Sequence, residues 1–164
     1  MRLSTRSRYG ILALMDLAVH ASDGPVMVRE IAEREGLSER YLEQLLLSLK
    51  TGGIVRAMRG SGGGFTLARS PSEINIRDVI RITEGSTAFT ECADDPSVCS
   101  RSSSCALLDA WVEVTKAAEK VMASITIRDL IERQARKPSA NSGLGCPIPS
   151  KGVSQGIEEQ SNSK

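Results

Sequence analysis

Apolar residues recur at helical spacing through most of the chain. From Tyr9 to Val19 nearly every position is apolar except Asp16, which predicts a first helix that is covered on most sides. Residues 28–35 continue with a short amphipathic helix that ends before a glycine turn. Ser38 then stands where an N-cap is favoured, before a helix that carries four leucines at helical spacing: Leu42, Leu45, Leu46 and Leu49. Two short helices joined by such a turn match a helix-turn-helix.

A glycine-rich hairpin is expected directly after this unit. GIVRAMRG and FTLAR have the pattern of two strands, and Ser61-Gly62-Gly63-Gly64 joins them. A hairpin in this position makes the helix-turn-helix a winged helix.

Further helices are predicted downstream. Asn75 caps a helix to Thr83, and a helix near 127–136 closes the periodic sequence. Between them, a long helix over 106–122 carries one apolar stripe: Leu107, Trp111, Val114, Ala118 and Val121. The sequence beyond Lys137 is rich in Ser, Gly and Pro without periodicity, so we expect disorder there.

Composition narrows the functional classes. Apolar residues make up 40% of the 164 positions but aromatic residues only 3%, which favours a helical core. The net charge is +1, so binding to nucleic acid has to come from local placement of charge. No run of about 18 apolar residues exists, and Asp16 interrupts the N-terminal apolar stretch, which lacks a signal-peptide cleavage site. We therefore expect a cytoplasmic protein with no membrane partner and with reduced thiols.

The start of the second helix of the helix-turn-helix carries side chains suited to base edges. These are Arg40, Tyr41, Glu43 and Gln44. Arginine suits guanine, glutamine suits adenine, and a carboxylate can accept from the cytosine amino group. In the wing, Arg59 precedes small residues that include Gly62, which allows close approach to DNA. Each feature alone is also typical of a solvated helix or a flexible turn, but together they favour double-stranded DNA as the partner.

Three cysteines share one polar loop. Cys92, Cys99 and Cys105 are too widely spaced for a Cys-x-x-Cys redox pair, but one loop can fold them around a single metal centre. Such a loop beside a DNA-binding module suggests a regulator controlled by metal or redox state. Zinc, with a carboxylate or water as fourth ligand, is one alternative, and thiols that bind nothing are another. Cys146, in the tail, is incidental or resolves an oxidised thiol.

Three stretches of the chain closely resemble the IscR family of winged-helix iron–sulfur regulators. They are MRLSTRSRYGILALMDLA, IAEREGLSERYLEQLLLSLKTGGIV and VRAMRGSGGGFTLAR, and the similarity covers about the first 130 residues. The resemblance implies a homodimer on operator DNA, in which the helix around Trp111 packs against its partner. It carries a role in DNA recognition to Tyr41, Glu43 and Gln44, and a role in the wing to Arg59 and Ser61. The family commonly has proline at the place of Ser61, so this wing is expected to be looser.

The expected fold is therefore mostly α with a small β-hairpin wing, a winged helix-turn-helix followed by a long C-terminal dimerisation helix. Residues 1–84 form the DNA-binding domain, with the helix-turn-helix at about 28–51 and the wing at about 54–69. The remaining segments are the cluster loop (85–105), the dimerisation helix with a final short helix (106–136) and the disordered tail (137–164).

The resemblance also implies an iron–sulfur cluster at the three cysteines, of the 2Fe–2S type or alternatively 4Fe–4S. Such a cluster needs four ligand positions. In the regulator that names the family a histidine lies three residues after the last cysteine, where this chain has Leu108. The fourth ligand stays open between several sources: Asp109, Asp94, Asp95, Glu91, a residue of the partner subunit or a small molecule. His20, the only histidine, is expected to be a plain surface residue of the first helix.

The leading hypothesis is thus a transcriptional regulator controlled by an iron–sulfur cluster, acting as repressor or activator on genes for cluster assembly, iron handling or oxidative and nitrosative stress. Cluster-assembly proteins are a further candidate partner. The alternative is a cluster-free winged-helix repressor controlled by thiol oxidation or zinc. A third hypothesis is an accessory protein that donates a cluster. No signature of a substrate pocket, paired general base or phosphate loop supports an enzyme.

Overall fold

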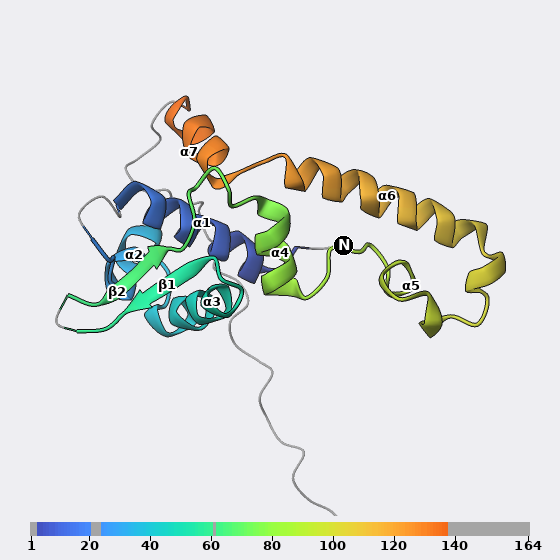
Figure 1. Cartoon of the computed structure of the whole chain (residues 1–164), viewed down its shortest axis with the longest axis horizontal. Coiled ribbons are helices and arrows are strands. Elements are labelled where there is room, and N and C mark those ends of the chain that lie inside the picture. The colour runs from blue at the N-terminus through green and yellow to red at the C-terminus, as the bar shows by residue number, and fades with distance from the viewer. Residues whose placement is uncertain (1–2, 21–23, 61, 138–164) are drawn as a thin grey trace, which may run out of the picture.

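The protein has a helical body from which one long helix projects (Figure 1). The computed structural model describes residues 3–20, 24–60 and 62–137. The expectations for Ser61, Cys146 and the tail from 138 onward lie outside the described residues. Within the described part, seven α-helices accompany one two-stranded antiparallel sheet, which confirms the expected mostly α fold with a hairpin. None of the helices in that part is long and apolar enough to cross a membrane.

Three helices build the helix-turn-helix and its support. They are α1 (Thr5–His20), α2 (Val28–Glu35) and α3 (Glu39–Thr51). Gly36 ends α2 with φ of 64°, a left-handed conformation that glycine adopts at little cost, and the chain then turns into α3. One cluster of fully buried side chains joins the three helices: Leu14, Leu17, Ile31, Leu42, Leu46 and Leu49. The turn geometry and this shared core fix the orientation of α3.

The wing is a hairpin of β1 (Val55–Met58) and β2 (Gly64–Leu67), paired antiparallel with Val55 opposite Leu67. On its other side β2 pairs with Val26, whose N–H and carbonyl both bond to Phe65, at 3.0 and 2.8 Å. The hairpin is therefore anchored to the linker between α1 and α2, and the base of the wing moves with the body.

Two later helices complete the body. Asn75 accepts a hydrogen bond from the Asp78 N–H at 3.0 Å and caps α4 (Ile76–Glu84), as the sequence predicts. Helix α7 (Ile127–Ala135) returns to pack on α1, and its Ile127 is fully buried in the main core. Backbone bonds between residues 74–76 and 125–127 tie the starts of α4 and α7 together. Helix α7 therefore holds the C-terminal end of the projecting helix to the body.

The projecting part consists of α6 (Ala106–Ala123) and the segment that leads into it (Figure 1). This segment contains α5 (Glu91–Asp94) and two single-turn 3-10 helices, η2 (Pro96–Val98) and η3 (Ser102–Ser104). Helix α5 lies beside α6, so the chain first runs away from the body alongside α6 and then returns to the body as α6 itself. The sequence predicted one polar loop here, and the structure resolves it into three short turns.

Candidate DNA interface and cysteine segment

The first two turns of α3 present a polar face to solvent. Arg40, Glu43 and Gln44 are exposed, and so is Leu47 one turn further on. The opposite face of the same helix is buried through its four leucines. The amphipathic pattern therefore leaves three of the side chains expected to contact bases facing solvent, and their contact with DNA stays a prediction.

Tyr41 differs from its neighbours because it is half-buried. Its ring packs edge-on against Tyr9 of α1, with centroids 6.0 Å apart, and its hydroxyl lies 3.4 Å from Thr5 Oγ1. This contact fixes α3 against the first turns of α1. The role of Tyr41 in DNA recognition stays a prediction, and its packing role is one that sequence reasoning missed.

The wing places Arg59 and Gly62 in solvent at the turn of the hairpin. The turn is closed by a hydrogen bond from Gly63 N–H to the Gly60 carbonyl at 3.0 Å. A Cβ built on Gly64 would lie 2.4 Å from the Val26 carbonyl oxygen, whereas one on Gly62 meets nothing within 4 Å. Gly64 is therefore needed for the close contact of the hairpin with Val26. The sequence alone did not distinguish this folding role from the role in DNA binding proposed for the glycine run.

A buried ionic cluster supports the helix-turn-helix from behind. Arg34 of α2 donates two hydrogen bonds of 2.7 Å to the carboxylate of Asp16, which is fully buried in α1. This pair joins α1 to α2, and the hydrogen bonds to Asp16 raise the pKa of Arg34. His20 is exposed, as expected, and its Nδ1 lies 3.0 Å from the Asp16 carbonyl oxygen. The lone acidic residue in an apolar run was the available signal for such a pair.

Glu35, at the end of α2, is also buried, and neither of its carboxylate oxygens has a hydrogen-bond partner among the described residues. Burial, and then the nearby Asp16 carboxylate, raise the pKa of Glu35 to about 7. Below about pH 7 the Glu35 carboxyl, which lies beside the turn of the helix-turn-helix, is therefore held mainly in its neutral form.

The three cysteines occupy different turns of the segment before α6. Cys92 lies in α5, with its Sγ 3.4 Å from Thr90 Oγ1. Cys99 follows η2 directly, and Cys105 stands at the N-cap of α6. All three thiols are free and half-buried. No three His, Cys, Asp or Glu side chains within the described ranges are gathered closely enough to hold a metal ion.

Leu108 is buried in the first turn of α6 and is only 7% exposed, whereas Asp109 faces solvent. The side chain that stands where the resembling family has a ligand therefore packs as a core residue. The other carboxylates proposed as fourth ligands, Glu91, Asp94 and Asp95, are all exposed. The Asp95 carboxylate is already hydrogen-bonded, since its Oδ1 accepts from the Ser97 N–H at 2.9 Å. Hydrogen bonds from the Ser97 side chain, and then from its N–H, lower the pKa of Asp95.

The start of the cysteine segment is fastened to α6 by contacts that sequence reasoning did not anticipate. The buried Thr87 hydroxyl donates to Glu119, and the Phe89 N–H donates to Thr115 Oγ1 at 3.3 Å. The rings of Phe89 and Trp111 stack with an interplanar angle of 9°. The segment that carries Cys92 is thereby coupled to α6.

Another face of α6 has no cover among the described residues. Leu107, Val114 and Val121 recur every seven positions and are 61%, 42% and 59% exposed. Three large aliphatic side chains therefore lie exposed in one line along the projecting helix.

Comparison with known proteins gives one family. The model of the Rrf2 family, described as an iron-dependent transcriptional regulator, matches residues 3–133. Among similar relatives, the protein rrf2 of Nitratidesulfovibrio vulgaris is 37% identical over 131 residues, which cover 80% of this chain and 87% of that protein.

Solved structures agree with this result. The structure of T. potens IscR superposes with a TM-score of 0.66 at 38% identity and covers 85% of this chain and 94% of that one. The structure of CymR, described as the global cysteine regulator of B. subtilis, also gives 0.66, at 33% identity over 81% and 98% of the two chains. The likeness therefore extends to one relative named IscR and to another described by cysteine regulation.

Proposed function

Because the chain belongs to the Rrf2 family of transcriptional regulators, which are not enzymes, we propose that it is a cytoplasmic homodimer that binds operator DNA under the control of an iron–sulfur cluster. The observation that carries this proposal is the pairing of an exposed polar recognition helix and wing with three half-buried thiols on a segment fastened to α6.

At the DNA, the exposed side chains of Arg40, Glu43 and Gln44 meet base edges in the major groove, and Tyr41 holds the start of α3 in place. Arg59 and the wing residues Ser61 and Gly62 approach the backbone and the minor groove. Because the net charge is only +1, individual cationic side chains have to supply the phosphate contacts. The Glu43 carboxylate lowers the affinity for DNA, because it repels phosphate, and raises selectivity for cytosine.

Two copies of the chain pair through the apolar stripe of α6. This helix has 18 residues and is therefore about 27 Å long. Pairing through α6 would present two recognition helices together, so a two-fold symmetric operator is expected.

The donor set fits an iron–sulfur cluster in its chemistry, since Cys92, Cys99 and Cys105 supply three thiolates, the ligands that such clusters prefer. When bound, the cluster would supply sensitivity to iron supply, oxidants and nitric oxide. The fourth position is open, because Leu108 is buried and aliphatic. Asp109, the carboxylates of the segment, a partner residue and a small exogenous molecule stay the candidates, and both 2Fe–2S and 4Fe–4S stay open.

The chain itself offers a route from the thiols to the DNA-binding body. The cysteine segment contacts α6, α6 contacts α4, and α4 is bonded to the first turns of α1 through Ser7 and Thr83, whose hydroxyl oxygens lie 2.7 Å apart. A change in the order of the segment would therefore shift the populations of body orientations in the dimer and so the preferred operators.

The test begins with anaerobic purification of the full chain. The expected result is a coloured protein with iron and acid-labile sulfide, which Cys92→Ala, Cys99→Ala and Cys105→Ala each lose and Cys146→Ala retains. Selection of duplexes from a random library should then yield a sequence-specific operator. A colourless preparation after reconstitution contradicts the cluster, and the absence of sequence preference contradicts the regulator.

A second function has a specific observation in its favour. Leu108 is buried and supplies no fourth ligand, which suits a cluster-free repressor controlled by thiol oxidation or by zinc, because zinc also accepts a carboxylate or water in that position. One zinc ion per chain, or a disulfide without iron, would identify this alternative. Electron paramagnetic resonance of Leu108→His adds a direct comparison, since an unchanged spectrum shows that position 108 is not at the cluster.

A further inference from the structure

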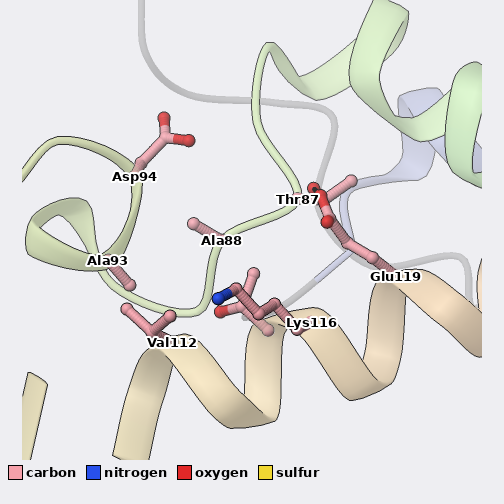
Figure 2. Close-up of a pocket in the computed structure, with 8 residues that line it drawn as sticks. Thr87, Ala88, Ala93, Asp94, Val112, Lys116 and Glu119 are labelled. Carbon is pink, nitrogen blue, oxygen red and sulfur yellow. Dashed lines mark hydrogen bonds between the residues drawn. The ribbon is translucent and has the colours of Figure 1, made fainter. Parts of the chain in front are cut away.

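A small cavity lies between α6 and the segment that carries Cys92 (Figure 2). Its volume is about 160 Å³, and Ala88, Ala93 and Val112 supply its apolar wall. The α6 residues that line it are centred about 150° around the helix from the exposed stripe, since each residue advances the helix by about 100°. The cavity is therefore separate from the surface expected to pair two chains.

Unpaired charges of both signs line this cavity. Lys116 and Glu119 come from α6, and Asp94 comes from the end of α5. No ion pair joins any of these three side chains within the described part of the chain, and Lys116 has no hydrogen-bond partner there. Figure 2 shows the Lys116 amine between α6 and the segment, Glu119 beside Thr87, and the Asp94 carboxylate turned outward at the rim.

The carboxylate of Glu119 is positioned by its neighbours. Its Oε1 accepts a hydrogen bond from Thr87, a side chain that is 4% exposed. This bond fixes the carboxylate at one end of the cavity and leaves its other oxygen available. Thr115, 9% exposed, adds a hydroxyl whose oxygen accepts from the Phe89 N–H and whose proton has no acceptor among the described residues.

We propose that this cavity binds a free α-amino acid with a small side chain, with its carboxylate on Lys116 and its ammonium group on Glu119. Opposite charges that line one cavity without pairing match a ligand that carries both charges. The volume corresponds to about five water molecules at roughly 30 Å³ each, which suits a molecule of five to eight non-hydrogen atoms and excludes nucleotides. The apolar wall takes the side chain.

Binding also has a consequence for the cysteines. Ala93 and Asp94 follow Cys92 directly on α5, so a ligand that bridges this turn and α6 holds Cys92 against α6. By reciprocity, amino acid and cluster would each change the affinity for the other. This coupling rests on the proposed function, whereas the binding itself does not.

Calorimetric titration of the metal-free full chain with single L-amino acids tests the proposal. At least one amino acid with a small side chain should bind with a dissociation constant of about 1 mM or below, within the limit for so few atoms. Acetate and methylammonium, which carry one charge each, should bind at least about tenfold more weakly.

Variants separate a charge effect from a folding effect. Lys116→Ala and Glu119→Gln should each weaken binding by about tenfold or more, and Glu119→Gln keeps an oxygen to accept from Thr87. Lys120→Ala, on the same helix but outside the cavity, should bind as the unmodified chain does.

The absence of binding at about 10 mM of every amino acid, equal affinity in Lys116→Ala, or equal binding of acetate or methylammonium would each overturn the proposal. Because neither DNA nor iron enters the titration, such a failure leaves the regulator proposal intact. An amino acid that binds without any effect on iron affinity contradicts the coupling.

Discussion

Neighbouring glycines in the wing have different physical roles. A side chain at Gly64 collides with the backbone of Val26, at the contact that anchors the hairpin to the body. Gly62 has open space around it and no unusual φ, so the fold itself accepts a side chain there. The fold therefore does not require glycine at position 62, and the proposed reason for glycine there is close approach to DNA.

Gly64→Ala is therefore expected to lower the free energy of unfolding by roughly 2 kcal/mol through overpacking, and Gly62→Ala to change it by less than about 0.5 kcal/mol. Gly62→Ala should instead weaken DNA binding several-fold. Urea denaturation and fluorescence anisotropy with a selected operator measure the two effects. Unchanged DNA affinity in Gly62→Ala would show that the wing turn does not approach DNA closely.

Glu35 makes the stability of the protein depend on pH. Its pKa is raised from 4.5 to about 7 in the folded chain. The proton is therefore held more tightly in the folded state, and the folded state loses stability as pH rises from about 4.5 through about 7. Asp16, Arg34 and His20 are the charged and titratable groups that act on this carboxyl, and two of them belong to α1.

Glu35→Gln removes this penalty and should raise the free energy of unfolding at about pH 8 by on the order of 2 kcal/mol, since each pKa unit corresponds to about 1.4 kcal/mol and burial of an amide returns part of it. At about pH 4.5 the substitution should have little effect. Urea denaturation across this pH range is the measurement. Glu33→Gln, exposed on the same helix, is the matched control and should keep the slope of the unmodified chain. Parallel profiles for the unmodified chain and Glu35→Gln would refute a protonated Glu35.

At the scale of elements, two helix starts that look alike in sequence differ in the structure. Asn75 accepts from the Asp78 N–H and closes the first turn of α4. Ser38 also stands at an N-cap with extended backbone, but its side chain makes no cap hydrogen bond. Ser38 is thus the N-cap residue, as predicted, but its side chain does not make the hydrogen bond that an N-cap serine usually makes.

Asn75→Ala is expected to cost roughly 1 kcal/mol of stability, because it leaves a helix N–H without its partner. Ser38→Ala should cost clearly less. Chemical denaturation of both variants provides the comparison within one protein. A loss in Ser38→Ala as large as that in Asn75→Ala would mean that the serine caps α3 in solution.

At the scale of the whole molecule, the projecting helix α6 leaves an apolar stripe that the described part of its own chain does not cover. Its stripe of Leu107, Val114 and Val121 is exposed, while Trp111 in the same predicted stripe stacks on Phe89 of its own chain. Burial of aliphatic side chains contributes about 25 cal/mol per Å², so covering this stripe would favour the pairing that we propose.

Val114→Lys should therefore shift the protein from dimer to monomer in sedimentation equilibrium and reduce affinity for a two-half-site operator by at least about tenfold. The physical reason is that an ammonium group at the centre of the stripe must lose its water on pairing. Glu113→Lys changes charge at the neighbouring exposed position and should stay dimeric. A dimeric Val114→Lys protein would contradict pairing through this stripe.

The sequence allowed prediction of the features that depend on neighbouring residues. The helices around Leu42–Leu49 and Asn75–Thr83 were predictable because apolar period, caps and glycine stops all lie within a few residues. The contacts of Asp16 with Arg34 and of Thr87 with Glu119 join residues 18 and 32 positions apart. Such pairings depend on how helices pack, so no local pattern reveals them.

The sequence by itself determined the helix-turn-helix with its hairpin, the polar face of α3 and the presence of three thiols in one segment, because these follow from side-chain periodicity and from residue identity. Only the tertiary structure decided that Tyr41 braces α3, that Leu108 is buried, that α7 returns to the body, and that unpaired charges line one cavity beside Cys92. The physical reason is that burial, desolvation and charge pairing belong to the packed chain, whereas periodicity belongs to each segment alone.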